Sequence, residues 1–279
     1  MPDLLAPVTS QVANQAADIS LPCLSQLLSR AEAFSLPGAG KHPHSIETLV
    51  SDSLLSEVKT SGVAQLTYQH DFSGIERANL KSAANVLRAD PVYQQLDMHS
   101  ATLADPSVLD LDEAESQALL DTLNLHFVDH GLRFEHKSPS RWYGHFDELP
   151  DVETTPLSAA TGCDVALHRP QGPDAQSWRR QLAEVEMILF EHPVNLHRQS
   201  VGKLPVNSLW LWGEGQAPTD SGNALPDRLP ENISENLSIA SDHFYTRCVA
   251  SHLQLPVSSP EQLASSCLLY TSPSPRDRG

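Results

Sequence analysis

Residues 191–215 of the chain read EHPVNLHRQSVGKLPVNSLWLWGEG, and this stretch decides the fold. Its last part, Val206 to Trp212, is a short apolar run between Pro205 and Gly213. An apolar run of this length, bounded by turn residues, is typical of a buried strand. In open α/β sheets, ligands bind outside the carboxyl ends of the strands. Glu214 is therefore expected at the rim of a binding site.

The polar segment before this strand supplies the other candidate ligand-binding side chains. His192, Asn195 and Arg198 come ahead of the strand, and Asn207 lies at its start. Together with Glu214 they form the predicted ligand-binding surface, for which a small phosphorylated or carboxylate ligand is expected. The alternative is that asparagines and a histidine beside a helix break satisfy buried backbone groups.

The same segment resembles the cofactor-independent phosphoglycerate mutases of the archaeal type. It is more similar still to a bacterial offshoot of that group, the RpfE-type regulatory proteins. The similarity rests on HPVN (192–195), Arg198, Gly202, Pro205, Asn207 and LWLWGEG (209–215). FDELPDVETTPLSAATG (146–162) and RADPVYQQLD (88–97) resemble the offshoot as well. The resemblance covers roughly residues 85–255 and implies an alkaline-phosphatase-like α/β fold.

The resemblance also implies where catalytic residues would lie. Active members of the alkaline phosphatase superfamily have an Asp soon after the first strand, followed by a Ser or Thr nucleophile that two metal ions activate. After the expected first strand, residues 4–8, this protein has Thr9, Ser10 and Gln11 and no Asp-Gly. Asp18 and Ser20 follow in a context that resembles a helix cap.

We therefore expect a degenerate, non-catalytic relative of the mutases that is regulatory or ligand-binding and needs no cofactor. The alternative is a metal-dependent phosphoglycerate mutase or phosphatase that uses two Mn or Zn ions. Its remaining metal ligands would then lie beyond the last residue of this sequence.

Composition limits the classes of partner. The 279 residues have a net charge of −17, which disfavours nucleic acid and anionic membranes because both require clustered Lys and Arg. No apolar run approaches the ~20 residues that span a bilayer, and no signal-peptide pattern follows Met1. The four cysteines show no CxxC spacing. A cytoplasmic protein is expected, and the sequence names no protein partner.

The predicted organisation has four parts. Residues 1–95 and 148–266 are expected to form an α/β domain, a sheet flanked by helices. Residues 96–147 are expected to form a small inserted β-α-β-β module, similar to the lid domain of phosphoglycerate mutases. Residues 267–279 resemble one reading frame of a transposon-type sequencing adapter. This tail is expected to be non-native, and the protein is then truncated at its C-terminus.

Local patterns predict the elements of the module. A strand is expected over 96–103, and a helix is expected to begin at a capping box of Asp112 and Glu115 and to end at Gly131. A hairpin is expected over 132–146. Elsewhere, the patterns predict helices over 21–34, 45–59, a segment reaching Leu87, 173–191 and 242–253, and strands over 63–68 and 237–241.

Three further groups have both a functional and a structural interpretation. Arg88 and Asp90 suit anion recognition or a structural ion pair, and the second is favoured. Arg133 and Arg141 suit substrate binding, as in the mutase lid, or surface positions on the hairpin. His126 with His130, and Asp242 with His243, have metal-ligand spacings, but helix-end positions explain them more simply.

Overall fold

The computed structural model describes Glu47, Val50 and residues 62–73, 85–98, 100–215, 239–241 and 243–259. The predicted elements over 4–8 and 21–34, most of 45–59, Asp242 and the tail 267–279 lie outside these residues. The protein divides into two compact units, one over Leu36–Val257 and one that joins Met1–Ser35 to Ser258–Gly279. The first unit contains the central sheet and the helices that cover it. No helix in the described ranges is both long and apolar enough to cross a bilayer.

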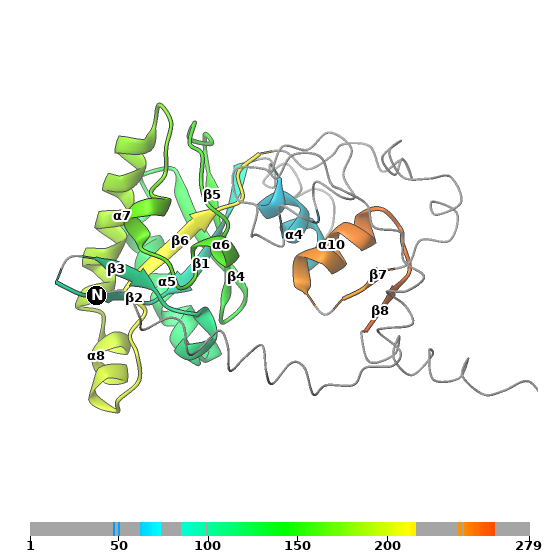
Figure 1. The fold of residues 1–279 in the computed structure, drawn as a ribbon. Helices are drawn as coiled ribbons and strands as arrows, with labels where there is room; N and C mark the ends of the chain where they lie inside the picture. Colours follow the sequence, from blue (N-terminus) through cyan, green and yellow to red (C-terminus); the bar gives the residue numbers. More distant parts are fainter. Residues whose placement is uncertain are drawn as a thin grey trace, which may run out of the picture. The chain divides into compact units, whose positions relative to one another are not determined.

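A four-stranded sheet forms the centre of this unit (Figure 1). The strands are β1 (Val86–Val92), β4 (Leu132–Ser138), β5 (Arg141–Phe146) and β6 (Ser208–Trp212), and they lie in the order β4-β5-β1-β6. Each neighbouring pair is antiparallel, with Arg88 opposite Trp212 and also opposite Tyr143. The predicted α/β class, a sheet flanked by helices, is confirmed.

The run that decides the fold is a strand, as predicted. All five residues of β6 are buried, so both faces of the strand are covered. Leu209 and Leu211 point into a core built with α5 (Glu113–Phe127) and α7 (Ala175–Phe190). Trp210 and Trp212 point the opposite way, because side chains alternate along a strand. They pack with α4 (Val63–Asp71) and α10 (Phe244–His252), so helices lie on both faces of the sheet.

The capping box predicted for α5 is confirmed. The Asp112 carboxylate accepts a hydrogen bond from the Glu115 backbone N–H at 2.8 Å, and the Glu115 carboxylate accepts one from the Asp112 N–H at 3.2 Å. The predicted apolar face, Leu119, Leu120, Leu123 and Phe127, is fully buried. Gly131 takes a φ of +65°, which suits the left-handed turn expected after the helix.

Three predicted elements are wrong. Residues 63–68 form the helix α4 rather than a strand, and the Thr67 hydroxyl donates back to the Val63 and Ala64 carbonyls within it. Val86 and Leu87 begin β1 rather than ending a helix. The strand expected over 96–103 is a hairpin of β2 (Gln94–Leu96) and β3 (Ala101–Leu103), because the backbone reverses where the Asp97 N–H donates to the Ser100 carbonyl.

The hairpin β4-β5 shares a sheet with β1 and β6, so strands from three of the predicted parts lie side by side. The domain boundaries themselves stay a prediction. The other described elements are the short helices η2 (Pro106–Leu109), α6 (Leu157–Ala160), η3 (Val165–His168) and α8 (Pro193–Ser200), and the strands β7 (Ile239–Ala240) and β8 (Val257–Ser258).

Candidate functional site

His192, the first of the five predicted ligand-binding residues, caps the N-terminus of α8. Its Nδ1 accepts a hydrogen bond from the Val194 N–H at 3.2 Å, and its Nε2 lies 2.9 Å from the Thr122 hydroxyl on α5. Because Nδ1 accepts, the neutral ring has its proton on Nε2. Burial lowers the pKa of His192, and a backbone hydrogen bond with Ala118 opposes this effect.

Asn195 is buried and joins the end of α7 to the approach of β6. Its amide nitrogen donates to the carbonyls of Leu189 and Val206, both at 2.7 Å, and its oxygen accepts from the Val206 N–H at 2.8 Å. The side chain therefore satisfies three backbone groups that a helix end and a strand start would otherwise leave unpaired.

Arg198 has no exposed surface. Its Nε donates to the Leu204 carbonyl at 2.8 Å, one terminal nitrogen pairs with Glu115 at 2.5 Å, and the other donates to the Leu109 carbonyl. A single guanidinium thus fastens α8 to the start of α5 and to η2. Its planar set of donors makes arginine suited to this bridging.

Asn207 and Glu214 lie at the two ends of β6. The Asn207 side-chain oxygen accepts a hydrogen bond from the Gln94 N–H at 2.7 Å, and its amide nitrogen donates to the Gln94 carbonyl at 2.8 Å. Glu214 accepts from the backbone N–H of Thr154 at 2.8 Å and from its hydroxyl. The five residues of β6 lie between the two positions, so the two side chains are on the order of 20 Å apart.

The structure therefore places His192, Asn195 and Arg198 together in a polar joint around α8, with Asn207 and Glu214 elsewhere. The expectation for Glu214 used a rule for parallel strands, whereas every described neighbour pair in this sheet is antiparallel. None of the five lines either of the two cavities described next. Ligand binding by these five residues stays a prediction.

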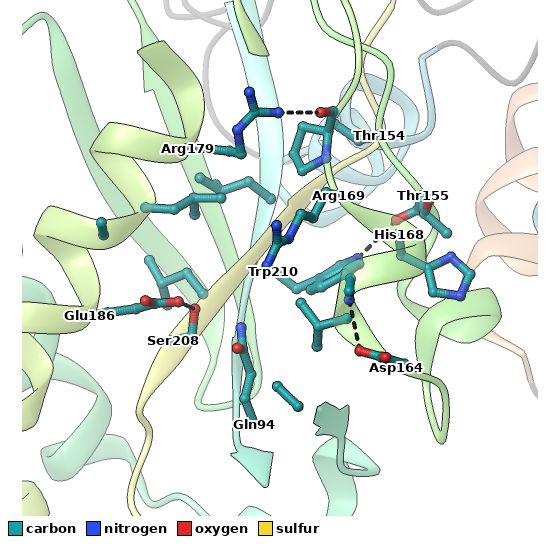
Figure 2. A pocket seen from close by; sticks show the side chains of 18 of the residues that line it. Gln94, Thr154, Thr155, Asp164, His168, Arg169, Arg179, Glu186, Ser208 and Trp210 are labelled. Atoms are coloured by element: carbon teal, nitrogen blue, oxygen red, sulfur yellow. Dashed lines mark hydrogen bonds between the residues drawn. The ribbon is translucent and has the colours of Figure 1, made fainter. Parts of the chain in front are cut away.

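Sequence reasoning missed the first cavity, here called the β6 cavity, which has a volume of about 480 Å³. Its walls come from Ser208–Leu211 of β6, one side of α7, the segments Thr154–Thr155 and Asp164–Pro170, and the β2-β3 hairpin (Figure 2). Apolar wall residues include Val165, Pro170, Leu182, Ala183 and Trp210. Two arginines, Arg169 and Arg179, also line it. In a protein of strongly negative net charge, these two arginines were the one cue in the sequence that could have pointed to an anion site here.

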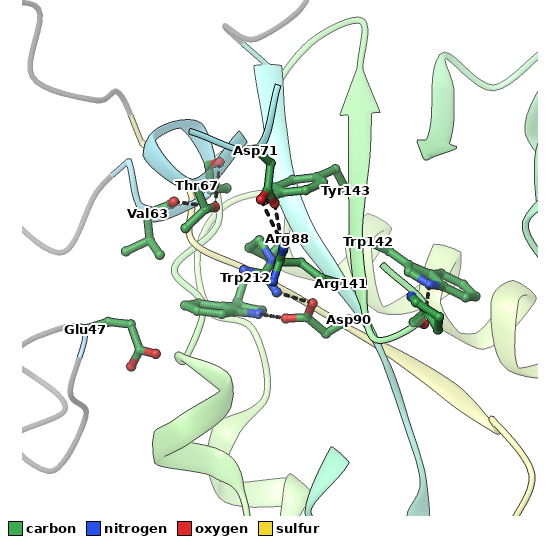
Figure 3. Close-up of polar contacts among 12 residues, drawn as sticks. Glu47, Val63, Thr67, Asp71, Arg88, Asp90, Arg141, Trp142, Tyr143 and Trp212 are labelled. Carbon is green, nitrogen blue, oxygen red and sulfur yellow. Dashed lines mark hydrogen bonds and ion pairs between the residues drawn. The ribbon is translucent and has the colours of Figure 1, made fainter. Parts of the chain in front are cut away.

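The second cavity, the Arg88 cleft, has a volume of about 400 Å³ and is lined by Arg88, Asp90, Arg141, Trp212 and residues of α4, α6 and α10. Arg88 and Asp90 are both buried and pair at 2.5 Å (Figure 3). The Arg88 guanidinium lies 5.4 Å from the Tyr143 ring centroid and 5.5 Å from that of Trp212. Burial is the largest influence on the pKa of Arg88 and lowers it, but the charge and hydrogen bond of Asp90 together with Tyr143 and Asp71 outweigh burial and raise that pKa.

The favoured interpretation of this pair, a structural ion pair, agrees with these contacts. The Trp212 indole N–H donates to the second carboxylate oxygen of Asp90 at 2.8 Å, so Asp90 is satisfied from both sides. The pair and its aromatic neighbours hold β1 to β5 and β6. Buried charges are tolerated only with such partners.

The two hairpin arginines are not brought together. Arg141 binds Asp71 through two nitrogens, at 2.7 and 3.0 Å, and lies 3.9 Å from the centroid of the Phe244 ring. Arg133 is exposed and contacts Glu135 at 3.5 Å. Arg141 therefore ties the hairpin to α4 and α10, whereas Arg133 occupies a surface position, the second of the two interpretations given from the sequence.

The histidines with metal-ligand spacing form no metal site within the described residues. His126 and His130 stack with their ring centroids 5.9 Å apart, and His126 lies 3.8 Å from Glu184. His243 lies 3.7 Å from Glu47. In the ranges that the structure describes, no three His, Cys, Asp or Glu side chains gather as a metal ion would require. The metal requirement itself stays untested.

Part of the chain is similar in sequence to known phosphoglycerate mutases. The chain is 30% identical over 165 residues to the 2,3-bisphosphoglycerate-independent phosphoglycerate mutase of Methanosarcina mazei, which covers 56% of this chain and 40% of that protein. It is 36% identical over 67 residues to a probable enzyme of the same kind from Geobacter sulfurreducens, over 24% of this chain and 17% of that protein. The matched part of this chain is similar to these phosphoglycerate mutases.

Two further findings complete the comparison. The cofactor-independent phosphoglycerate mutase of Thermoplasma acidophilum matches with a TM-score of 0.38 and 17% identity, over 77% of this chain and 63% of that one. No family model matches the sequence. The chain spans less than half the length of the curated relatives it matches.

Proposed function

We propose that this protein is a phosphoglycerate-mutase-like protein of the RpfE regulatory type, which binds a small anionic ligand and does not transfer phosphate. One observation carries the proposal. The residues on which the resemblance rests are used to hold the fold together. Asn195 and Asn207 bind backbone groups, and Arg198 binds two carbonyls and a carboxylate. Similarity in this segment can thus persist without catalysis.

The chemistry of the mutases supports the same proposal. A hydroxyl becomes an effective phosphate acceptor when a metal ion lowers its pKa, and the phosphoryl oxygens need cationic neutralisation. The first twenty residues contain no Asp-Gly followed by a Ser or Thr. We propose that the protein has no nucleic-acid or membrane partner, because its net charge of −17 repels polyanions, and that it is cytoplasmic, as expected from the sequence.

The test is a phosphoglycerate mutase assay on the purified 279-residue protein. 3-Phosphoglycerate and Mn²⁺ are supplied, and 2-phosphoglycerate is detected through enolase. An archaeal-type mutase assayed in parallel shows that the coupled system works, and a sample with EDTA gives the metal-independent background. We expect the rate with this protein to equal that background. A Mn²⁺-dependent rate above it would overturn the proposal and establish the alternative, a metal-dependent mutase or phosphatase.

A further inference from the structure

We propose that the β6 cavity binds an amphipathic anion, with its acidic group on Arg169 and Arg179 and its apolar body along β6. This inference rests on the proposed ligand-binding role and names the class of ligand. It differs from the sequence-based expectation in both place and chemistry. None of the five residues predicted from the sequence lines this cavity, and an apolar body was not part of that prediction.

The position of the cavity follows from the sheet. Ser208, Leu209, Trp210 and Leu211 all line it, although side chains of consecutive strand residues point to opposite faces. The cavity therefore runs along the outer edge of β6, which is the last strand of the described sheet. An outer edge offers backbone N–H and C=O groups that no neighbouring strand occupies, and these can bind polar atoms of a ligand.

The charged side chains are unevenly placed around the cavity (Figure 2). Arg179 lies at the upper end, where it donates to the Pro170 carbonyl at 3.2 Å. The Arg169 side chain reaches into the middle of the cavity and forms no ion pair with any residue that the structure describes. Glu186 and Asp164 lie lower in the same view. An anion is therefore favoured at the arginine end and disfavoured at the other.

The two carboxylates at the lower end already accept hydrogen bonds from the protein. The Ser208 hydroxyl donates to Glu186 at 2.9 Å, and the Ala166 N–H donates to Asp164 at 2.9 Å. The intervening walls are mostly apolar, and Trp210 is held in place because its indole N–H donates to the Thr155 carbonyl at 2.8 Å. A cavity of this size with apolar walls and a few fixed polar groups is typical of small-molecule sites.

This arrangement selects against a compact, highly charged molecule such as phosphoglycerate. Such a molecule would fill only the arginine end and would leave the apolar wall in contact with water. A molecule with one acidic group and an aromatic or branched apolar body covers that wall as well, and burying apolar area adds binding free energy in proportion to the area. Because the arginines lie at one end of the cavity and the apolar wall lies beside them, the best ligand has one acidic group and an apolar body.

The test uses two dyes that share an apolar body. 8-Anilinonaphthalene-1-sulfonate has one anionic group, and N-phenyl-1-naphthylamine has the same ring system without it. Binding of each to the full-length protein is followed by fluorescence titration, and circular dichroism melting confirms that each variant is folded. We expect saturable binding at one site, tighter for the sulfonate than for the neutral dye.

The variants separate charge from shape. Arg169→Gln and Arg179→Gln should each weaken sulfonate binding about three- to tenfold and leave the neutral dye unchanged. Arg180→Gln is the matched control, because Arg180 is the exposed neighbour of Arg179 on α7 and does not line the cavity. Ala183→Leu, at an exposed lining position on the same helix, should weaken both dyes because it fills the cavity.

Two results would overturn the inference. One is that Arg169→Gln and Arg179→Gln change sulfonate binding no more than Arg180→Gln does. The other is that 3-phosphoglycerate displaces the sulfonate dye at the concentration at which the dye binds, since a compact anion would then be an equal ligand. Neither result would change the conclusion drawn from a mutase assay without activity, because that assay does not depend on the β6 cavity. Conversely, Mn²⁺-dependent turnover together with the expected dye results would refute only the non-catalytic proposal.

Discussion

Replacing Arg198 distinguishes a side chain that holds the fold from one that binds a ligand. In Arg198→Met, the Glu115 carboxylate loses its cation, and the carbonyls of Leu109 and Leu204 lose their donor. Removing one partner of a buried ion pair costs about 3–5 kcal/mol, and an unpaired buried acceptor costs about 1–3 kcal/mol. The Glu115 side chain keeps 15% exposure and still accepts from Asp112, so water can compensate in part.

We therefore expect Arg198→Met to lower the free energy of unfolding by about 4 kcal/mol. The conservative Arg198→Lys keeps the charge but loses the planar fork, and about half of that loss is expected. The measurement is urea unfolding followed by tryptophan fluorescence, with the midpoints compared at a common slope. Arg180→Met on the exposed side of α7 serves as the control and should shift the unfolding free energy by less than about 0.5 kcal/mol.

The pair with Glu115 can be examined further by a double-mutant cycle. Adding Glu115→Gln to Arg198→Met removes the uncompensated charge, so the double variant should lose less stability than the sum of the single losses. An Arg198→Met variant that unfolds within about 1 kcal/mol of the parent would refute the scaffold argument. Arg198 would then be available for the ligand-binding role that the sequence suggested.

Two further predictions concern titration and reactivity. Because burial lowers the pKa of His192 in the folded protein, the unfolded state binds its proton at higher pH, so stability should fall as the pH drops below about 6.5. His192→Asn keeps a capping acceptor and should flatten this fall in urea midpoints; an unchanged pH profile would contradict the assignment. Burial raises the pKa of the Cys248 thiol to about 12, so iodoacetamide at about pH 8 should label the half-buried Cys163 far more than Cys248. Peptide mass spectrometry measures the ratio, and equal labelling would contradict the burial of Cys248.

The sequence predicted elements best where one local signal fixes the structure. The Asp112–Glu115 capping box marks the start of α5 because the two residues satisfy each other's backbone donors without help from distant segments. The apolar run of β6 is equally local, since a strand buried on both faces has apolar residues at nearly every position.

The sequence failed where distant contacts decide. Val63, Thr67 and Tyr68 have strand-forming side chains, yet the segment is helical. Its N-terminus is fixed by the end of β6, because the Gly62 N–H donates to the Glu214 carbonyl at 2.8 Å and the Ala64 N–H to the Gly213 carbonyl at 3.1 Å. No local pattern contains these partners.

The β6 cavity could not be predicted for the same reason. Its walls come from segments that are far apart in the sequence, and the sequence shows neither that Arg169 and Arg179 face the same space nor that β6 is an outer strand. The five residues predicted to bind a ligand do not form one site. A hydrogen-bonding side chain near a strand can bind either a ligand or a backbone group, and the sequence does not show which of the two it binds.

The pairing of Arg88 with Trp212 has a consequence for synthesis. The ribosome makes β1 and the hairpin β4-β5 well before it makes β6, so the β1 edge that pairs with β6 in the folded protein has no partner until then. Apolar β1 residues and unpaired backbone groups are then open to other polypeptides, and contacts so distant in sequence form slowly. The exposed β1 edge makes aggregation a risk in the interval before Ser208–Trp212 emerges, and we expect codons that slow translation there to lower the yield.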